Sequence, residues 1–356
     1  MTDADARAYL NAPTAGERLS NLRALLAGEE TPPPVRRELS NNHIHTTYSF
    51  SPYSPTAAVW FARQAGLPVA GIMDHDSIGG AAEFRKAANL AGIHATCGLE
   101  ARVSLAGTPF ESTRLNSPDQ TGIAYVAFHS IREEYFGRTQ EFFAPLREKR
   151  NDRNRAMVRN INDVTGQALD FDRDVLPISQ YADGGSVTER HLMYALAVKL
   201  LPGGTEQERF KLLGELKKEL VPKIYIPAKE ELISLDDAVA FSKEIDAILC
   251  YAYLGDVTAS PTGDKKAQKF EDDFLPELAS FLREHGVDAI TFMPSRNTEE
   301  QLERIMALCR ENGFRQISGE DINSLGQSFI CERLAQPAYA HLVEAAWGLT
   351  KREETP

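Results

Sequence analysis

The sequence predicts an α/β fold in which short strands alternate with helices around a parallel sheet, either open or closed into a barrel. Two features carry this expectation: the alternation of apolar runs with helical periodicity from Glu38 onward, and metal-binding residue types at the carboxyl ends of such runs. The predicted strands are 40–46, 67–73, 96–104, 122–128, 246–251, 287–292 and 314–318. The predicted helices are 55–65, 78–91, 235–245, 271–285, 298–312 and 336–348.

Residues 1–39 precede this alternation and predict a helical appendage. Segments 3–10 and 15–27 have helical spacing, and Gly28 ends the second of them. Thr31-Pro32-Pro33-Pro34 predicts a stiff linker into the first strand. We expect this appendage to serve packing or oligomer contacts, and we assign it no chemistry.

The first predicted strand contains His43-Ile44-His45. Residues i and i+2 of a strand face the same side, so both imidazoles can bind one metal ion. The helix that follows is predicted by Ser54 as its N-cap, Pro55 in its first turn and Gly66 as its stop. Two histidines on one strand are also compatible with a purely structural role.

The second predicted strand, which is apolar, ends in Asp74-His75-Asp76. The carboxyl ends of buried strands are where α/β barrels place their functional residues. The combination of His-x-His with Asp-His-Asp about thirty residues later is more specific than either motif alone. It predicts a metal site at the ends of the first two strands.

Three later positions have the same character. Glu100 lies within an apolar strand, where a carboxylate is unusual unless it is paired or ligated. His129 ends the run 124–128 and is either a metal ligand or a capped core residue. Asp321 follows the last predicted strand.

Between Ile131 and about Ala228 the alternation stops, and segments 153–164, 189–200 and 206–220 predict helices. Basic and acidic residues are nearly balanced there, although the chain has a net charge of −12. We interpret the stretch as a helical cap inserted into the α/β unit. Its basic run 147–155 is interpreted either as a solvated helix face or as a phosphate-facing cluster.

Composition excludes several function classes. A net charge of −12 argues against binding duplex nucleic acid through a basic surface. No apolar run approaches the roughly eighteen residues of a membrane helix, and the N-terminus lacks the features of a secretory signal. The four cysteines are scattered and mostly within apolar runs. We therefore expect a cytoplasmic protein with reduced core thiols and no membrane partner.

The motifs His43-Ile44-His45-Thr46 and Met73-Asp74-His75-Asp76 resemble the first two motifs of the polymerase-and-histidinol-phosphatase (PHP) superfamily of metal-dependent phosphoesterases. The resemblance covers roughly residues 40–335. It implies a distorted barrel of seven strands with an inserted helical cap. The expected organisation is an appendage, a first barrel part, the cap and a second barrel part, with bounds 1–39, 40–130, 131–230 and 231–350.

The resemblance also implies a ligand set and catalytic roles. The implied metal ligands are His43, His45, His75, Glu100, His129 and Asp321, with Glu100 bridging two ions. Asp74, His75 and Asp321 are implied as catalytic residues, and we expect Asp74 and Asp76 to orient ligand histidines.

Three positions depart from the family pattern. Phe50 stands where the family has aspartate, Asn323 stands where it has histidine, and Tyr251 lies near the place of a third lost ligand. Tyr251 and Asn323 are candidate replacement ligands. The ligands retained predict one or two divalent ions per chain, namely zinc, manganese or iron.

The cap resembles the nucleotide- and RNA-trimming branch of the superfamily, because Ser186 to His191 is similar to the Val-Thr-Arg-x-His start of a cap helix. Candidate substrate-binding residues are Arg153, Arg155, Arg190 and His191, with helix packing as the alternative for His191. The favoured function is metal-dependent hydrolysis of a small phosphorylated metabolite, a nucleotide or an oligonucleotide end. The alternative is a catalytically weakened metal-binding or ligand-sensing protein on a degenerate PHP scaffold, and either could form a homo-oligomer.

Overall fold

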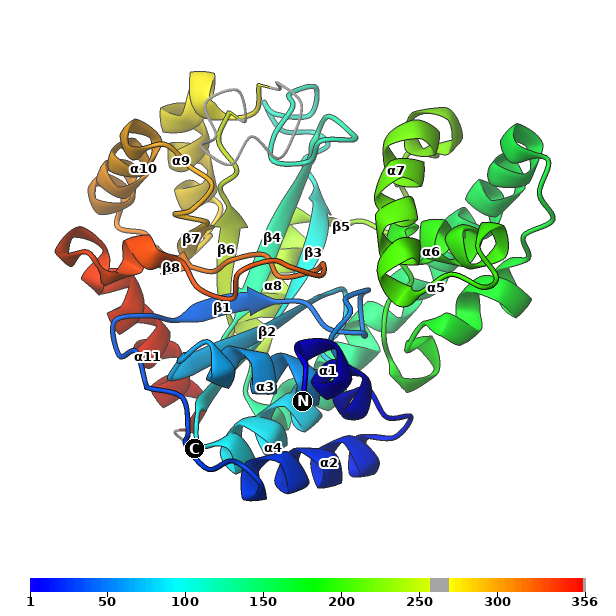
Figure 1. The fold of residues 1–356 in the computed structure, drawn as a ribbon. Coiled ribbons are helices and arrows are strands. Elements are labelled where there is room, and N and C mark those ends of the chain that lie inside the picture. Colours follow the sequence, from blue (N-terminus) through cyan, green and yellow to red (C-terminus); the bar gives the residue numbers. More distant parts are fainter. Residues whose placement is uncertain (257–268, 355–356) are drawn as a thin grey trace.

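The computed structural model describes residues 1–256 and 269–354, and they form one curled sheet with helices around it and a helical cap at one side (Figure 1). The strands follow the order β1-β2-β3-β4-β6-β7-β8, with β5 paired to β3 off this path. A parallel bridge between Ile44 and Ile322 joins the first strand to the segment after the last one. The predicted α/β barrel, distorted and partly closed, is therefore confirmed. The strands are β1 (Asn41–Ile44), β2 (Val69–His75), β3 (His94–Ser104), β4 (Ile123–His129), β5 (Ile233–Ser234), β6 (Ile248–Ala252), β7 (Ala289–Phe292) and β8 (Arg315–Ser318).

The expectation of a parallel sheet is wrong for one strand, since β4 runs antiparallel to both β3 and β6. A parallel pair needs a crossover connection of a dozen or more residues, usually a helix. The connection 105–122 between β3 and β4 contains no helix, so the chain turns back beside β3. The reversed direction places His129 deeper in the barrel than the start of β4.

Helices cover the outside of the sheet at the predicted positions. Ser54 caps the first barrel helix by accepting a hydrogen bond from the Ala57 amide, and Pro55 lies in its first turn. The last helix extends beyond the predicted range 336–348. The barrel helices are α3 (Pro55–Gln64), α4 (Ala81–Ala91), α8 (Leu235–Glu244), α9 (Leu275–Glu284), α10 (Glu299–Asn312) and α11 (Ala340–Glu354). Within residues 1–256 and 269–354, none of the helices combines the length and the apolarity needed to span a membrane.

Two layers of apolar residues surround the sheet. The larger layer lies between the strands and the outer helices and includes Leu249 and Tyr251. The smaller layer fills the barrel interior and consists of Met73, Ala127, Ile248, Cys250, Ala289, Ile317 and Leu349. Ile248 and Cys250 face inward, so Leu249 and Tyr251 must face outward because a strand alternates its side chains.

The N-terminal helices α1 (Asp3–Leu10) and α2 (Ala15–Ala27) are anchored to the barrel. Leu10 and Leu22 are fully buried in the larger apolar layer. Arg18 makes a buried ion pair with Glu83 of α4, with Nη2 and Oε2 2.6 Å apart. The segment therefore packs on the barrel, which is one of the two roles expected for it.

The cap consists of α5 (Phe136–Thr165), α6 (Glu189–Leu200) and α7 (Glu206–Ile224), shown in green in Figure 1. It has a separate apolar core, and one barrel residue, Phe50, is part of that core. The first cap helix is much longer than the predicted segment 153–164, because it already begins at Phe136, after a short loop and a 3-10 turn that follow β4. The cap core otherwise includes Met157, Ile161, Leu192, Leu196, Leu213 and Leu220.

A buried ion network joins the cap to the barrel. Arg150 Nη2 lies 2.7 Å from Asp76 Oδ2 at the end of β2, and Arg153 Nε lies 2.8 Å from Glu231 Oε2. Glu231 also pairs with Arg102 of β3. Both interpretations of the basic run 147–155 are therefore wrong for Arg147, Arg150 and Arg153, which are buried and anchor the cap.

A buried carboxyl group on α11 predicts a pH-dependent stability. Glu353 accepts a 2.8 Å hydrogen bond from the Cys97 amide, and its burial raises the pKa of the carboxyl group to about 8. The folded chain thus holds this proton more tightly than the unfolded chain. Stability from this group is greatest below its ordinary pKa and is lost as the pH rises towards about 8.

We expect Glu353→Gln to reduce this loss of stability, because an amide accepts the same hydrogen bond without ionising. The measurement is the free energy of urea unfolding at about pH 5 and about pH 9. Glu303→Gln is the matched control, since Glu303 is an exposed carboxylate on α10. An unchanged pH dependence in Glu353→Gln would contradict the prediction.

Candidate metal centre

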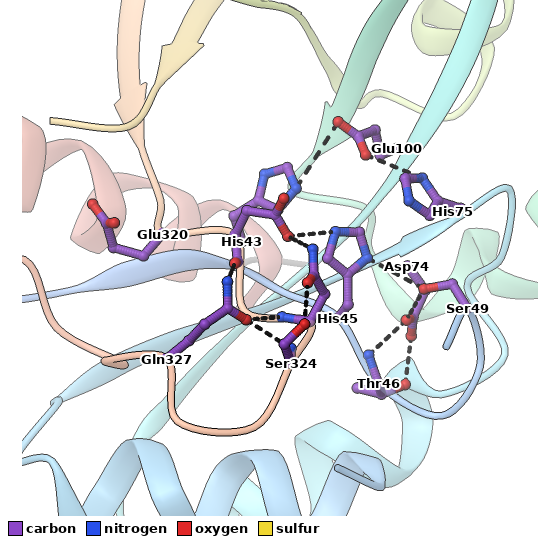
Figure 2. Close-up of polar contacts among 12 residues, drawn as sticks. His43, His45, Thr46, Ser49, Asp74, His75, Glu100, Glu320, Ser324 and Gln327 are labelled. Carbon is purple, nitrogen blue, oxygen red and sulfur yellow. Dashed lines mark hydrogen bonds and ion pairs between the residues drawn. The ribbon is translucent and has the colours of Figure 1, made fainter. Parts of the chain in front are cut away.

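Three histidines and two carboxylates converge at one end of the barrel, from β1, β2, β3 and the segment after β8. Figure 2 labels the three histidines and Glu100. His43, His45 and Glu100 each offer one ligand atom, and these atoms lie within 4.8 Å of one another. His75 Nδ1 lies 3.0 Å from Glu100 Oε2, and His45 Nε2 lies 3.2 Å from Asp321 Oδ1. All five residues belong to the ligand set implied by the sequence.

Strand register explains why these residues meet. His75 pairs with Glu100 across β2 and β3. The bridge between Ile44 and Ile322 places Asp321 beside His45. Gly319 allows the close approach, because a Cβ atom there would lie 2.6 Å from His43 Cβ. Positions far apart in the sequence are thus joined by backbone pairing.

Glu100 lies between two histidines, with Oε1 3.9 Å from His43 Nε2 and Oε2 facing His75. Burial by itself would raise the pKa of this carboxyl group, but the hydrogen bond and charge of His75 outweigh burial and lower the pKa to about 2. Glu100 is therefore an ionised carboxylate whose two oxygens face different partners. A carboxylate that bridges two cations needs this arrangement.

His129 lies one layer deeper and is 1% exposed. Its Nε2 has no hydrogen-bond partner among the described residues. Burial, reinforced by the nearby His43, lowers the pKa of His129 to about 3, so the imidazole is neutral with a free lone pair. A buried unpaired nitrogen is costly, and a cation bound there would satisfy it. The centre therefore fits a divalent ion with nitrogen and oxygen ligands.

Asp74 supports the centre from behind. Its carboxylate accepts hydrogen bonds from the Thr46 amide, at 2.7 Å, and from the Thr46 and Ser49 hydroxyls, both at 2.6 Å. Ser49 Oγ lies 3.2 Å from His45 Nδ1. Asp74 thus positions His45, a proposed metal ligand, through Ser49. The sequence analysis assigned no role to Ser49.

The expectation that Asp76 orients a histidine is wrong. Its carboxylate pairs with Arg150, as described above. The strand ends at His75, and Asp76 adopts a positive φ of 49°. Its side chain therefore no longer follows the alternation of the strand.

Neither candidate replacement ligand presents its oxygen to the centre. Asn323 donates a 2.6 Å hydrogen bond to Asp321 Oδ1, and its carbonyl oxygen accepts one of 2.5 Å from Arg190. Tyr251 faces the helices and lines a small apolar void with Leu278 and Ile290. Neither side chain offers an oxygen to the centre in this structure, which corrects the expectation for both.

Of the four candidate substrate-binding residues, only Arg190 reaches the centre. Its guanidinium also donates a 2.5 Å hydrogen bond to Ser324 Oγ. Arg153 pairs with Glu189 and Glu231, and Arg155 pairs with Asp172. The structure therefore places Arg153 and Arg155 in structural ion pairs.

His191 is buried in the cap core. Its Nδ1 accepts a 3.0 Å hydrogen bond from the Thr188 amide, and its ring packs on Phe50 with centroids 4.9 Å apart. Substrate contact by His191 is thus wrong for this structure. The packing alternative describes its surroundings.

Tyr125 faces the centre, and Lys217 of the cap lies within electrostatic range of Arg190 and Asp321; the sequence did not single out either residue. Tyr125 of β4 is half-buried, with its ring 6.0 Å from that of His75. The side chain of Lys217 of α7 is exposed. Partial desolvation by the surrounding protein, followed by the positive charge of Arg190, lowers the pKa of its ammonium group. Tyr125 could have been found from its spacing to His129, since both lie on one face of β4. No local signal distinguishes Lys217 from its neighbours.

Residues 41–168 match the family model described as PHP domain. The chain carries a PHP domain. The match contains both histidine motifs, Glu100 and His129, so the PHP resemblance of the sequence is confirmed. No sequence among the curated proteins matches the chain.

The fold of the PHP domain and cap is also similar to solved structures. One is from Bifidobacterium adolescentis and is provisionally named a metal-dependent phosphoesterase, with a TM-score of 0.62, 19% identity, and coverage of 89% of this chain and 98% of that one. Another is an amidohydrolase from Chromobacterium violaceum with bound sulfate and no metal, with a TM-score of 0.60, 19% identity, and coverage of 86% and 96%. At this identity the likeness shows the fold.

Proposed function

We propose that the protein is a metal-dependent hydrolase of phosphoesters. Two findings support a metal-dependent hydrolase: the PHP domain matched by residues 41–168, and the similar structures named as a phosphoesterase and an amidohydrolase. The observation that carries the proposal is the convergence of three histidines with Glu100 and Asp321, above the unpaired nitrogen of His129. The proposed substrate is a small phosphorylated metabolite, a nucleotide or an oligonucleotide end.

The proposed metal ligands are the six residues that the resemblance implied. They suit one or two ions of zinc, manganese or iron. When bound, such an ion supplies Lewis acidity toward a phosphoryl oxygen and makes water acidic enough to act as a nucleophile near neutral pH. The proposed ligands are His43, His45, His75, Glu100, His129 and Asp321.

The remaining residues of the centre would bind and orient. Asp74 fixes Ser49, and Ser49 fixes the ring of His45. Burial raises the pKa of Tyr125, so its hydroxyl keeps its proton and can donate a hydrogen bond to a phosphate oxygen. Arg190 and Lys217 bring positive charge from the cap to the barrel mouth.

The charge distribution favours a small substrate or the end of a strand. The chain has a net charge of −12, and the cap cations assigned to the centre are Arg190 and Lys217. Two such charges suit one or two phosphate groups, whereas a duplex needs a basic surface. The neighbour from Chromobacterium violaceum holds sulfate, an anion similar in shape to phosphate.

A phosphoester screen tests the proposal. The purified chain is loaded separately with zinc, manganese and ferrous iron and assayed for phosphate release from sugar phosphates, mononucleotides, nucleoside bisphosphates and short oligonucleotides. We expect turnover of at least one class in the presence of metal and its loss after chelation. Bound metal without turnover of any class would contradict the enzymatic proposal.

A second candidate is a metal-binding or ligand-sensing protein on the same scaffold. The observation that favours it is Phe50, which stands at a ligand position of the family and is part of the cap core. The two candidates are separated by the same screen together with calorimetry. A sensor would bind phosphorylated compounds in the metal-loaded state and leave them intact.

We expect Lys217→Gln to raise KM for the best phosphorylated substrate about ten-fold, because a charge-assisted contact contributes roughly 1.5–3 kcal/mol. Metal content should not change, since Lys217 is not among the proposed ligands. Lys218→Gln is the matched control, because it is the next residue on α7 and is also exposed. Equal KM values for the two variants would remove Lys217 from the substrate site.

A further inference from the structure

The amino-terminal ends of β6 and β8 form a pocket with α11, at the end of the barrel opposite the metal centre. Its volume is about 360 Å³, within the range of pockets that bind small molecules. Figure 1 shows α11 running beside β8 at the lower left of the sheet. The floor is apolar and consists of the buried side chains of Ile248, Ile317 and Leu349.

A glycine keeps one wall of the pocket open. Gly348 lies inside α11, and a Cβ atom there would meet nothing within 4 Å. No positive φ and no close approach require glycine at this position. Glycine inside a helix costs roughly 0.5–1 kcal/mol relative to alanine. The absence of a side chain therefore leaves space in the pocket at some cost to the helix.

Arginine side chains line the walls of the pocket, and no carboxylate is among the described residues that line it. Arg315 is exposed, and no ion pair or side-chain hydrogen bond involves it in the described part of the chain. Arg352 also lines the pocket, but its charge is neutralised by an ion pair with the carboxylate of Asp246. Its guanidinium also donates a 2.8 Å hydrogen bond to the main-chain oxygen of Asp246. His341 Nε2 lies 3.0 Å from Gln316 Oε1. Arg315 thus supplies one uncompensated cation at the edge of an apolar floor.

We propose that this pocket binds a small organic anion with an apolar body, such as an aromatic or branched carboxylate or sulfonate. The apolar body would cover Ile248, Ile317 and Leu349, and the anionic group would pair with Arg315. The site is separate from the metal centre, since it lies at the other end of the same strands. It does not depend on the hydrolase proposal.

The probe for this site is 8-anilinonaphthalene-1-sulfonate, which combines an apolar ring system with a sulfonate and fluoresces strongly in apolar surroundings. We expect saturable binding to the full chain. Gly348→Leu should weaken binding at least ten-fold, because the added side chain fills the pocket. Gly214→Leu is the matched control, because Gly214 also lies inside a helix, α7, and a Cβ atom there would meet no atom within 4 Å.

The charge is tested by Arg315→Gln, which should weaken sulfonate binding about ten-fold, the loss of roughly one charge-assisted contact. N-phenyl-1-naphthylamine has the same rings without the sulfonate, and its affinity should not change in this variant. Arg159→Gln, on an exposed part of α5, is the matched control. Circular dichroism and the Tm of each variant verify folding.

Three results would overturn the proposal. One is the absence of saturable sulfonate binding to the wild-type chain. Another is equal binding by Gly348→Leu and Gly214→Leu, which would place the probe elsewhere. The third is an equal loss of affinity for both probes in Arg315→Gln, which would remove the role of its charge and with it the anionic class of ligand.

Discussion

Glu100→Gln is expected to lower hydrolytic activity at least about a hundred-fold and to reduce the number of bound metal ions. The substitution keeps the size of the side chain and removes the negative charge. Glu100 faces His43 with one oxygen and His75 with the other, so no other carboxylate of the centre takes the same position. A neutral amide has one weak oxygen ligand and cannot bridge two cations.

The measurements are elemental analysis of the purified protein and kcat with the best substrate. Glu320→Gln is the matched control, because Glu320 lies beside Asp321 in the sequence while its carboxylate points away from the centre and pairs with Ser295 (Figure 2). We expect the control to keep wild-type metal content. Full metal content and activity in Glu100→Gln would mean that Glu100 is not a ligand.

Phe50→Asp is expected to destabilise the protein by about 3–5 kcal/mol, the usual cost of removing a buried aromatic ring. The ring of Phe50 packs on His191 at 4.9 Å and on Tyr194 and Phe210 at 5.7 Å. The guanidinium of Arg190 lies 5.3 Å from the ring centroid. A new carboxylate could pair with Arg190, but that gain offsets only part of the lost packing.

Phe50 adopts a positive φ of 84°, which bulky residues rarely adopt, so the packing of its ring has to offset backbone strain. Phe50→Leu is the matched control, since it keeps an apolar side chain and the same backbone strain. The measurement is urea unfolding of both variants. If the aspartate variant is as stable as the leucine variant, Phe50 does not hold the cap.

The resemblance alone predicts that Phe50→Asp with Asn323→His would restore a third metal ion beside His75. The structure leads to the opposite expectation. Phe50 points into the cap core, and Asn323 links Asp321 to Arg190. We therefore expect elemental analysis of the double variant to show no additional ion, and a third ion at full occupancy would show that the loops can rearrange.

Local sequence signals predicted the secondary structure well where caps and periodicity were strong. Ser54 and Pro55 marked the start of α3, and the apolar runs marked seven of the strands. The local signals failed where the direction or pairing of a strand depended on its neighbouring strands. The direction of β4 was wrong because pairing, and not the composition of the strand, decides whether a strand runs parallel. The two-residue β5 was missed because it is too short to have a pattern.

The candidate centre followed the same division. His43, His45, His75 and Glu100 were found because strand alternation and motif spacing are local properties. The roles of Asp76 and Asn323 depended on the partner that each side chain met, Arg150 and Arg190 respectively. Tyr251 was excluded because its side of β6 faces the outer helices.

The sequence by itself determined that this chain is an α/β protein with a PHP domain, a helical insert and a cluster of metal-binding residue types at strand ends. The tertiary structure decided which charged residues are structural and which face the centre. Arg153 and Arg190 are both cap arginines, yet one is buried against Glu231 and the other reaches Asn323. The physical reason is that the role of a long charged side chain depends on desolvation and on partners distant in sequence, which only the packing of the cap on the barrel brings together.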